Sequence, residues 1–425
     1  MVTGRWVHGD HTDMAFPADA DSLREGGNSF LNTAFRSFGT LGDENEVVRI
    51  ARLEEVSGGS TGRKAVLDVE YAYSDRDLSR QLFVKFSRDF DDPRRDLGRT
   101  QMESEVRFAA LSRAPGFPIA VPATQFADYH SESGTGILVT ARIPFGTNGV
   151  EAQYHKCLDY EMPRQVAHYR ALLTAVARLA GTHRAGRLPE SLVAQFPIDL
   201  QAATVGERVP FSADQLDRRL ARLADFTEAH PGLFAANLRS RRFAARMTVE
   251  ARELLTLEGS VWQHLRDASD YIALCHWNAN VDNAWFWTDG ELRCGLMDWG
   301  CVSQMNVAMA IWGSLCGAET DVWDDHLDAL LVMFCDEVSG SGGPTLDPAV
   351  LRRQLVLYAT LMGVTWLLDV PALLRKRVPD ISPQTTRTDP RIKHAEGVRA
   401  PLQMLTNVLN LWETRGLDEG LSLVQ

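Results

Sequence analysis

The residues best suited to chemistry lie close together between positions 274 and 300. His276 is followed two residues later by Asn278, Asn283 comes five residues after that, and Asp298 follows after fifteen more. Amide and carboxylate oxygens are hard ligands, and an imidazole can donate or accept a hydrogen bond. The aromatic stretch 285–287 is typical of a strand, so we expect a hairpin that brings Asn283 and Asp298 together.

A glycine-rich turn lies earlier in the chain, between two expected strands. Its residues are Gly58, Gly59, Ser60, Thr61 and Gly62. Without side chains, backbone N–H groups can approach a phosphate closely and donate to it. Glycine and serine are also common in ordinary hairpin turns, so this motif alone indicates a phosphate site no more strongly than a plain turn.

A single lysine, Lys85, is embedded in an apolar strand. An isolated strand lysine usually faces solvent, but a buried one needs a carboxylate partner. The helix expected twenty residues later offers Glu105, with Glu103 as the competing choice. Glu105 shares a helical face with Met102 and Ala109, which we expect to point to the core, so Glu105 is preferred.

The elements that position these residues change character along the chain. Residues 1–45 are polar and weakly periodic, as in an extension. Alternating apolar residues predict strands at 47–56, 65–73, 81–86 and 136–140, with one helix at 100–113 among them. Helical periodicity then predicts helices at 163–183, 213–228, 235–268, 305–316, 321–338, 348–370 and 396–415. One strand-rich segment, 271–298, interrupts these helices.

Composition excludes several classes of protein. The 44 basic and 56 acidic side chains give a net charge of −12, which argues against a nucleic-acid-coating protein. The six cysteines are scattered and form no C-x-x-C pair, so they indicate reduced thiols. No apolar run approaches the roughly 20 residues that span a bilayer, and the start of the chain is unlike a secretory peptide. We expect a soluble, cytoplasmic protein with no nucleic-acid or membrane partner.

The order of these motifs carries a family resemblance. A glycine-rich hairpin, a strand lysine, a helix glutamate, H-x-N-x-x-x-x-N and then D-W-G resembles the aminoglycoside phosphotransferase-like family. The resemblance implies an α+β, protein-kinase-like two-lobed fold. A small antiparallel N-lobe with one helix would span 46–142, after an extension at 1–45. A large helical C-lobe would span 143–425 and carry the catalytic and metal loops.

The resemblance also assigns roles to residues. The glycine-rich turn and Lys85 would hold the phosphates of ATP or GTP, and Glu105 would hold Lys85. Asn283 and Asp298 would bind Mg²⁺, which bridges the nucleotide phosphates. Backbone groups near 140–143 would meet the adenine or guanine edge.

The catalytic loop departs from the family pattern. The family keeps H-G-D-x-x-x-x-N, whose Asp accepts the substrate hydroxyl proton, whereas this chain has Trp277 and Asn278 at the second and third positions. Asn306 likewise stands where the family often has Asp. His276 and Asn278 are the candidate catalytic residues, although an amide cannot act as a useful base near neutral pH. Asp282 could substitute, but a turn or cap carboxylate is the more common role for such a residue.

Together these features predict a Mg²⁺–nucleotide-dependent phosphotransferase that acts on a hydroxyl of a small molecule. General-base catalysis contributes about 10² to 10⁴ in rate, while phosphoryl transfer depends chiefly on positioning and charge stabilisation. The alternatives are another nucleotide transfer or a pseudokinase that binds nucleotide or a partner. Acidic residues near 319–325 would suit an amine-bearing substrate, but such residues are more often the solvated start of a helix.

Overall fold

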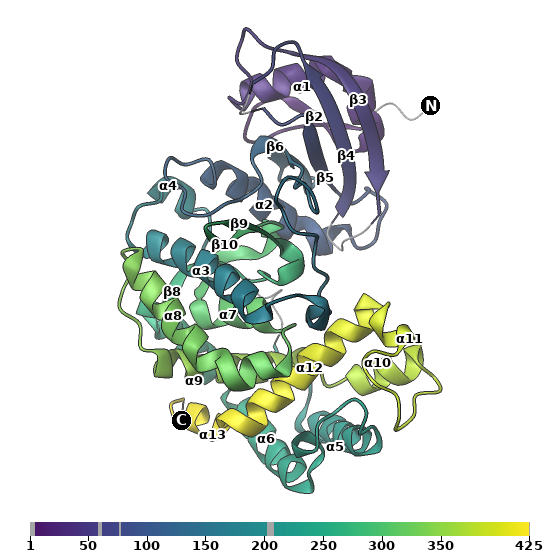
Figure 1. The fold of residues 1–425 in the computed structure, drawn as a ribbon, viewed down its shortest axis with the longest axis vertical. Coiled ribbons are helices and arrows are strands. Elements are labelled where there is room, and N and C mark those ends of the chain that lie inside the picture. Colours follow the sequence, from purple (N-terminus) through teal and green to yellow (C-terminus); the bar gives the residue numbers. More distant parts are fainter. Residues whose placement is uncertain (1–4, 58–61, 76–77, 202–207, 425) are drawn as a thin grey trace. The chain divides into compact units, whose positions relative to one another are not determined.

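The computed structural model describes residues 5–57, 62–75, 78–201 and 208–424. Two compact units make up the chain, which Figure 1 colours by sequence. The first unit comprises Met1–Val150, Leu188–Phe196 and Gly295–Val302, and the second comprises Glu151–Arg187, Pro197–Cys294 and Ser303–Gln425. The return of the chain through Gly295–Val302 carries Asp298 into the first unit.

A five-stranded antiparallel sheet forms the framework of the first unit, in the order β3-β4-β5-β7-β6. The strands are β3 Val47–Val56, β4 Gly62–Tyr71, β5 Gln81–Ser87, β6 Thr124–His130 and β7 Thr135–Ala141. The apolar pattern predicts four of them. It does not predict β6, because Gln125 and Asp128 interrupt its apolar residues, although both side chains are buried.

The two faces of this sheet have separate cores. Val84 and Phe86 of β5 belong to a large apolar cluster that also contains residues of α1, Ala20–Ser37. On the other face, residues of α2, Arg99–Leu111, including Met102, pack against Leu138 of β7. Because successive strand residues point to opposite faces, Lys85 faces α2 rather than α1.

The first 45 residues contain more regular structure than the sequence predicts. Strands β1 Trp6–His8 and β2 Ala15–Pro17 pair with each other and precede α1. Asp19 begins the helix by accepting a hydrogen bond from the Ser22 N–H at 2.8 Å. Gly27 has a φ of 55° and breaks the helix into two parts, which explains why its periodicity is weak in the sequence.

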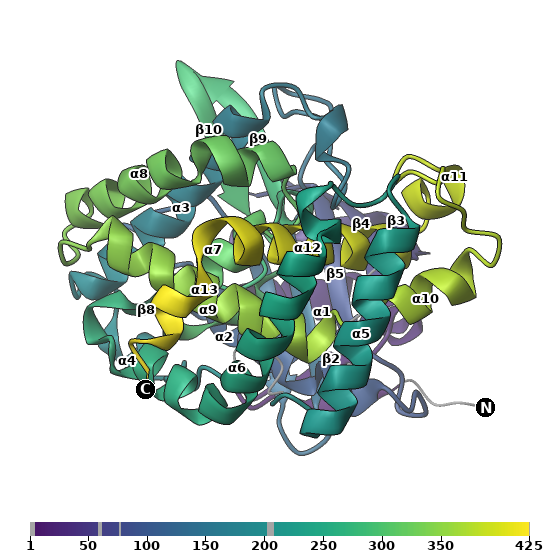
Figure 2. The same ribbon diagram turned by 90° about the horizontal axis from the view of Figure 1, so that it is seen from below.

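The second unit is mainly helical, which with the first unit's sheet confirms the predicted α+β class. Its helices are α3 Gln165–Arg184, α5 Ala213–Ala229, α6 Arg241–Asp267, α7 Val307–Leu315, α8 Leu327–Gly340, α9 Pro348–Trp366, α10 Val370–Arg377, α11 Pro390–Lys393, α12 Glu396–Arg415 and α13 Leu417–Leu421. Figure 2 shows α5 beside α6 and α12 across α9, and both pairs are in contact. The short α4, Glu190–Val193, belongs to the first unit.

Four further strands form two-stranded sheets, in which β9 pairs with β10 and β8 with β11. They are β8 Ile272–His276, β9 Ala284–Asp289, β10 Glu291–Leu296 and β11 Val302–Asn306. The sequence predicts a helix from Met305, but α7 begins at Val307 because Asn306 ends β11. The predicted helix 348–370 ends earlier, at Trp366, and a separate helix that the sequence does not predict begins at Val370, with Pro371 in its first turn.

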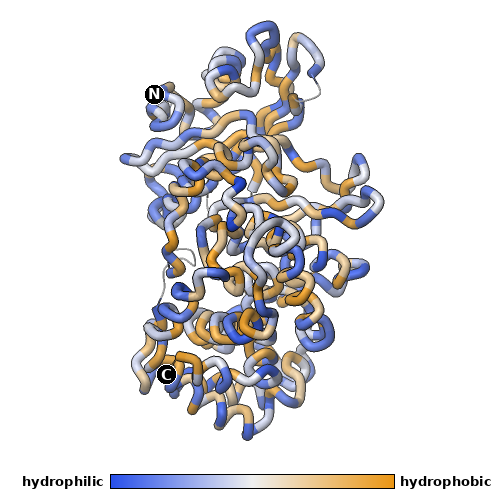
Figure 3. The backbone as a smooth tube through the Cα atoms, turned by 90° about the vertical axis from the view of Figure 1, so that its left-hand side faces the viewer, coloured by the Kyte–Doolittle hydropathy of each residue, from blue (hydrophilic) through white to orange (hydrophobic). Residues whose placement is uncertain are grey.

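Hydrophobic and hydrophilic stretches alternate along the described backbone in Figure 3. Within the described residues, no single helix has both the length and the apolar composition that a membrane crossing requires. One bent pair, α9 with α10, passes on length and composition alone.

Candidate active site

Lys85 lies at the centre of an ion-pair cluster in the first unit. Its Nζ is 2.6 Å from Glu105 Oε1 and 2.5 Å from Asp298 Oδ1. The Lys85 side chain is 13% exposed and that of Glu105 is 5% exposed, so the pair is shielded from water, whereas the Asp298 side chain is 35% exposed. A strand, a helix and a returning loop thus converge on one ammonium group.

The choice between the two glutamates of α2 follows from this geometry. Glu105 is the residue that contacts Lys85, whereas Glu103 pairs with Arg107 one turn along the helix. The helical-face argument places Glu105 inward because it shares the face of Met102, which is buried against the sheet.

Burial and charge act in opposite directions within this cluster. Burial alone would lower the pKa of the Lys85 ammonium, but Asp298 and Glu105 outweigh it and raise that pKa. Burial raises the pKa of the Glu105 carboxyl, and the nearby Asp298 charge adds to the effect against the opposing Lys85 charge. Lys85 therefore stays protonated, while two carboxylates share it.

The loop that carries Asp298 is held by aromatic packing. Asp298 has a φ of 65°, a left-handed conformation that Asp tolerates better than most residues. The next residue, Trp299, stacks on Phe108 of α2 with ring centroids 3.8 Å apart, and its Nε1 donates to the Leu296 carbonyl at 3.0 Å. The D-W-G tryptophan thus fixes the carboxylate beside the helix that supplies Glu105.

Most of the glycine-rich turn, Gly58, Gly59, Ser60 and Thr61, lies outside the described residues. Gly62 begins β4, where an added Cβ would stand 2.0 Å from the Phe86 carbonyl oxygen. Glycine is therefore required there for the close approach of two strands. A small cavity of about 10 Å³ lies beside it, lined by Gly62, Arg63, Lys64, Lys85, Phe86, Met102 and Glu105.

Lys64 is a cation that the sequence analysis does not identify. It pairs with Lys85 across β4 and β5, so both side chains lie on one face. Burial, and then the Lys85 charge, lower the pKa of the Lys64 ammonium. Among the described residues, no carboxylate lies within ion-pair distance of Lys64. The strand register could have revealed it, but sequence does not determine the register of these two strands.

Residues 140–143, which the sequence analysis expects to meet a nucleotide base, form several backbone hydrogen bonds within the first unit. The Ala141 N–H donates to the Ala123 carbonyl at 2.8 Å, and the Arg142 N–H donates to the Gln81 carbonyl at 2.9 Å. The Ile143 carbonyl accepts from the Phe145 N–H at 3.0 Å.

In the second unit, the predicted catalytic loop joins β8 to β9. His276 ends β8 with no exposed surface, and its Nδ1 accepts from the Asn278 N–H at 3.1 Å. Asn283 is 7% exposed, and its Nδ2 donates to the Asn278 carbonyl at 2.9 Å. His276 and Asn283 therefore hold the backbone of Asn278 from both sides.

The side chain of Asn278 has partners of its own. Its Oδ1 accepts from Asn280 Nδ2 at 2.6 Å and from Lys156 Nζ at 3.4 Å. Lys156 belongs to the segment before α3, far away in the sequence. The sequence analysis does not identify it, because no motif marks that segment and only tertiary structure brings it to Asn278.

Other polar residues singled out in the sequence have structural partners. Asn306 caps α7, where its Oδ1 accepts from the Ala308 N–H at 3.0 Å. Glu319 pairs with Arg387 at 3.1 Å, and Asp324 accepts from Asn410 Nδ2 at 2.7 Å. Part of the acidic group near 319–325 is thus already engaged.

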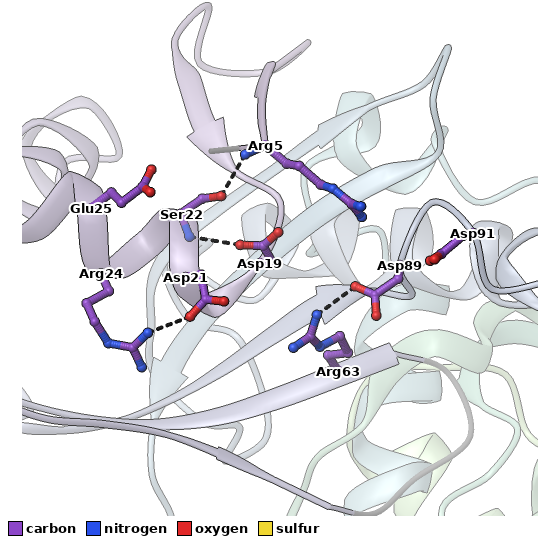
Figure 4. A pocket seen from close by; sticks show the side chains of 9 residues that line it. All are labelled: Arg5, Asp19, Asp21, Ser22, Arg24, Glu25, Arg63, Asp89 and Asp91. Carbon is purple, nitrogen blue, oxygen red and sulfur yellow. Dashed lines mark hydrogen bonds and ion pairs between the residues drawn. The ribbon is translucent and has the colours of Figure 1, made fainter. Parts of the chain in front are cut away.

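A larger cleft of about 730 Å³ lies elsewhere in the first unit and contains none of the predicted site residues. Figure 4 shows its charged lining, in which Arg24 pairs with Asp21 and Arg63 with Asp89, both at 2.6 Å. The lining holds three arginines and five carboxylates, so it is acidic, and exposed ion pairs such as these two contribute little to stability.

The residues assigned to Mg²⁺ fit that ion in chemistry. Asp298 offers a carboxylate, and Asn283 turns its amide nitrogen to the backbone, which leaves its Oδ1 without a donor among the described residues. Mg²⁺ commonly uses one or two protein oxygens together with phosphates and water. No cluster of three or more His, Cys, Asp or Glu side chains suited to a metal occurs in the described part of the chain.

No protein-family model and no curated protein matches the sequence. Solved structures of similar fold include a Plasmodium vivax ethanolamine kinase, 14% identical, with 85% of this chain and 83% of that chain covered and a TM-score of 0.42. A Cryptosporidium parvum choline kinase is 12% identical, with coverages of 92% and 96% and a TM-score of 0.45.

A spectinomycin phosphotransferase, in a complex with ADP and spectinomycin, is 12% identical, with coverages of 86% and 95% and a TM-score of 0.37. All three are described as kinases or phosphotransferases of small molecules.

Proposed function

We propose that the protein transfers a phosphoryl group from a nucleotide to a hydroxyl of a small molecule. The observation that carries the proposal is the contact of Lys85 with both Glu105 and Asp298. A shielded lysine held by a helix glutamate, next to the aspartate of D-W-G, is the arrangement that phosphate anchoring requires in kinase-type enzymes.

Each residue then has a defined task. Lys85 binds the nucleotide phosphates and Glu105 orients its ammonium. The two carboxylates give the cluster one negative charge more than Lys85 cancels, so added phosphates need further positive charge. Asp298 and Asn283 would hold Mg²⁺, which when bound supplies that charge on the phosphate oxygens.

Asn278 has a positioning task in this proposal. Its amide can hold a hydroxyl or a cation by hydrogen bonds, but it cannot remove a proton near neutral pH. The rate then depends on positioning and on charge stabilisation, which in phosphoryl transfer are the main contributions.

A second candidate is a nucleotide-binding pseudokinase. The observation that favours it is the short contact between Asn278 Oδ1 and Asn280 Nδ2, which occupies the amide oxygen. In this case the Lys85 cluster binds nucleotide, and no transfer follows.

Nucleotide titrations test the part that both candidates share. Thermal unfolding is measured with ATP, GTP or ADP, each with and without Mg²⁺, for the wild type and for Lys85→Met and Glu103→Gln. We expect a nucleotide-dependent rise in the melting temperature that Lys85→Met abolishes. Glu103→Gln, on the same helix but away from the cluster, should keep it. A wild type that binds no nucleotide would falsify both candidates.

Product analysis separates the two candidates. The wild type and Asn278→Asp are incubated with Mg²⁺–nucleotide and panels of hydroxyl-bearing small molecules, and phosphorylated product and nucleotide hydrolysis are quantified. Product formation by the wild type supports the kinase. Nucleotide binding with no product or hydrolysis from either protein supports the pseudokinase.

A further inference from the structure

Lys156 is a partly buried ammonium group without a charged partner. Its Nζ lies 3.4 Å from the neutral Asn278 Oδ1. Among the described residues, no carboxylate lies within 4 Å of this nitrogen. A shielded charge is unfavourable unless it is paired or strongly hydrogen-bonded, so this side chain is poised to take an anion.

The backbone holds Lys156 in place. A turn closes between the His155 carbonyl and the Leu158 N–H at 3.1 Å, with Lys156 and Cys157 as its central residues. Cys157 has a φ of 60°, an uncommon conformation for this residue. Arg399 Nε of α12 donates to the Lys156 carbonyl at 2.9 Å and ties the turn to the helical core. A strained conformation that is held by its surroundings is a reason to look for function.

The charges around Lys156 keep it protonated. Burial alone would lower the pKa of its ammonium, but Cys316 and Asp282 outweigh burial and raise that pKa, with smaller contributions from Cys157 and Glu396. Burial raises the pKa of the Cys316 thiol to about 11, so this thiol is uncharged at neutral pH. At neutral pH the charges that act on Lys156 are therefore the carboxylates of Asp282 and Glu396, both from beyond ion-pair distance.

We propose that Lys156 is a catalytic residue whose ammonium binds an oxygen of the phosphoryl group under transfer. This inference rests on the proposed function, in which Asn278 occupies the position of the family's catalytic carboxylate. Lys156 touches that position, so it can place a positive charge where the transferred group gathers negative charge. Asn278 acts as a positioning residue that holds the ammonium without neutralising it. An aspartate at this position would neutralise it.

Phosphoryl transfer to the acceptor hydroxyl can then proceed without a carboxylate base. The acceptor hydroxyl oxygen forms a bond to the γ-phosphorus, and the bond from that phosphorus to the bridging oxygen of the nucleoside diphosphate breaks. The bridging oxygen keeps the electron pair. The hydroxyl proton passes to an oxygen of the transferred group and then to water, since a phosphate monoester releases its second proton with a pKa near 6, about one unit below neutrality.

Comparing nucleoside triphosphate with diphosphate tests this contact without requiring turnover. Affinities of Mg²⁺–ATP and Mg²⁺–ADP, or of the guanine pair if the wild type prefers it, are measured by calorimetry. The variants are Lys156→Met, Lys156→Gln and Lys156→Arg. The control is Lys393→Met, which removes a lysine of the same unit that pairs with Glu161 at 2.5 Å.

We expect both neutral variants to bind the diphosphate as the wild type does and to lose about tenfold in affinity for the triphosphate. Lys156→Arg should keep part of the preference, and Lys393→Met should keep all of it. Where product forms, turnover should fall roughly a hundredfold in the neutral variants, as for loss of one transition-state donor.

Two results would overturn the inference, and they can be told apart. Neutral variants with the wild-type triphosphate preference and turnover would remove Lys156 from the site and leave the proposed function intact. A wild type that binds neither nucleotide would remove the proposed function, and the inference with it. Unfolding curves show which of the two neutral variants, Lys156→Met and Lys156→Gln, is folded, and the affinities are compared for a folded one.

Discussion

Two shielded lysines in this protein have opposite surroundings. Lys85, in the first unit, is held by two carboxylates within 2.6 Å. Among the described residues, the side-chain hydrogen bond of Lys156, in the second unit, is to the neutral oxygen of Asn278 at 3.4 Å. The first lysine is more than neutralised by its neighbours, and the second is not. The Lys85 ammonium is therefore fixed by carboxylates that cancel its charge, whereas the described neighbours of Lys156 leave its charge uncancelled.

A carboxyl group of the second unit shows the same lack of compensation. Asp159 is 1% exposed, and its Oδ2 accepts from the Tyr169 hydroxyl, but its Oδ1 has no hydrogen-bond partner in the described part of the chain. Buried polar atoms are nearly always paired, and exceptions occur most often where function requires them. Asp159, like Lys156, therefore has no oppositely charged partner at ion-pair distance among the described residues.

The largest expected effect is on stability when Lys85 is removed. Lys85→Met leaves two carboxylates facing each other in a shielded site, and breaking such a pair costs about 3–5 kcal/mol. Lys156→Met removes no ion pair and should change the free energy of unfolding by less than about 1 kcal/mol. Urea unfolding at pH 7 measures both values. Equal losses in the two variants would contradict the comparison.

The next effect concerns pH and the unpaired carboxyl of Asp159. The pKa of this carboxyl is raised from 3.8 to about 7, chiefly by burial and further by the charges of Glu319 and Asp282. The Tyr169 hydrogen bond and the Arg387 charge act in the opposite direction. The folded protein thus holds a proton that the unfolded chain releases. The resulting stability is complete below about pH 4, is lost as the pH rises to about 7, and is constant above that.

Asp159→Asn keeps a neutral side chain at every pH and so tests this directly. The variant should exceed the wild type in stability at pH 8, by at most about 4 kcal/mol, because each pH unit corresponds to about 1.4 kcal/mol. The advantage should shrink at pH 5. Denaturant unfolding at both values checks the slope, and an advantage independent of pH would show that Asp159 ionises normally.

A matched pair of variants on α2 compares a buried ion pair with a partly exposed one within one helix. Glu105→Gln weakens a charged hydrogen bond to Lys85 and should cost about 2 kcal/mol. Glu103→Gln removes only a partly exposed pair with Arg107, worth about 0.3–0.5 kcal/mol. Thermal unfolding of both, with and without nucleotide, measures the contrast. Only Glu105→Gln should also weaken nucleotide binding.

The sequence predicts the elements of the candidate site better than the contacts within it. Alternation along β5 and helical periodicity along α2 place Lys85 and Glu105 on inward faces, because both patterns depend only on local geometry. The hairpin after His276 is predicted for the same reason. The helix α1 is obscured by its paired glycines, and β6 by buried polar residues.

The rest depends on tertiary structure. Lys156 contacts Asn278 across 122 positions, and nothing near residue 156 marks it. Lys64 faces Lys85 only through the register of β4 and β5, which no local pattern specifies. The ion pair of Glu319 with Arg387 is equally non-local. The sequence therefore shows the acidic group near 319–325 but not that part of it is already paired.

The smallest expected effect is that of Asn278→Asp, which gives Lys156 a carboxylate neighbour like those of Lys85. Asn278→Asp places a carboxylate about where the amide oxygen lies, 3.4 Å from Lys156 Nζ. An ion pair should then form, with a coupling energy of about 1 kcal/mol in a double-mutant cycle with Lys156→Met.

The same ion pair would neutralise the Lys156 ammonium, which in the proposal binds the transferred phosphoryl group. If Lys156 binds that group, Asn278→Asp should weaken triphosphate affinity more in the Lys156 background than in the Lys156→Met background, where only repulsion by the new carboxylate remains. An aspartate that raises turnover at least roughly tenfold would instead show a site that lacked only its base. Asn278 is therefore best understood together with Lys156, since a carboxylate at position 278 and an available ammonium at position 156 exclude each other.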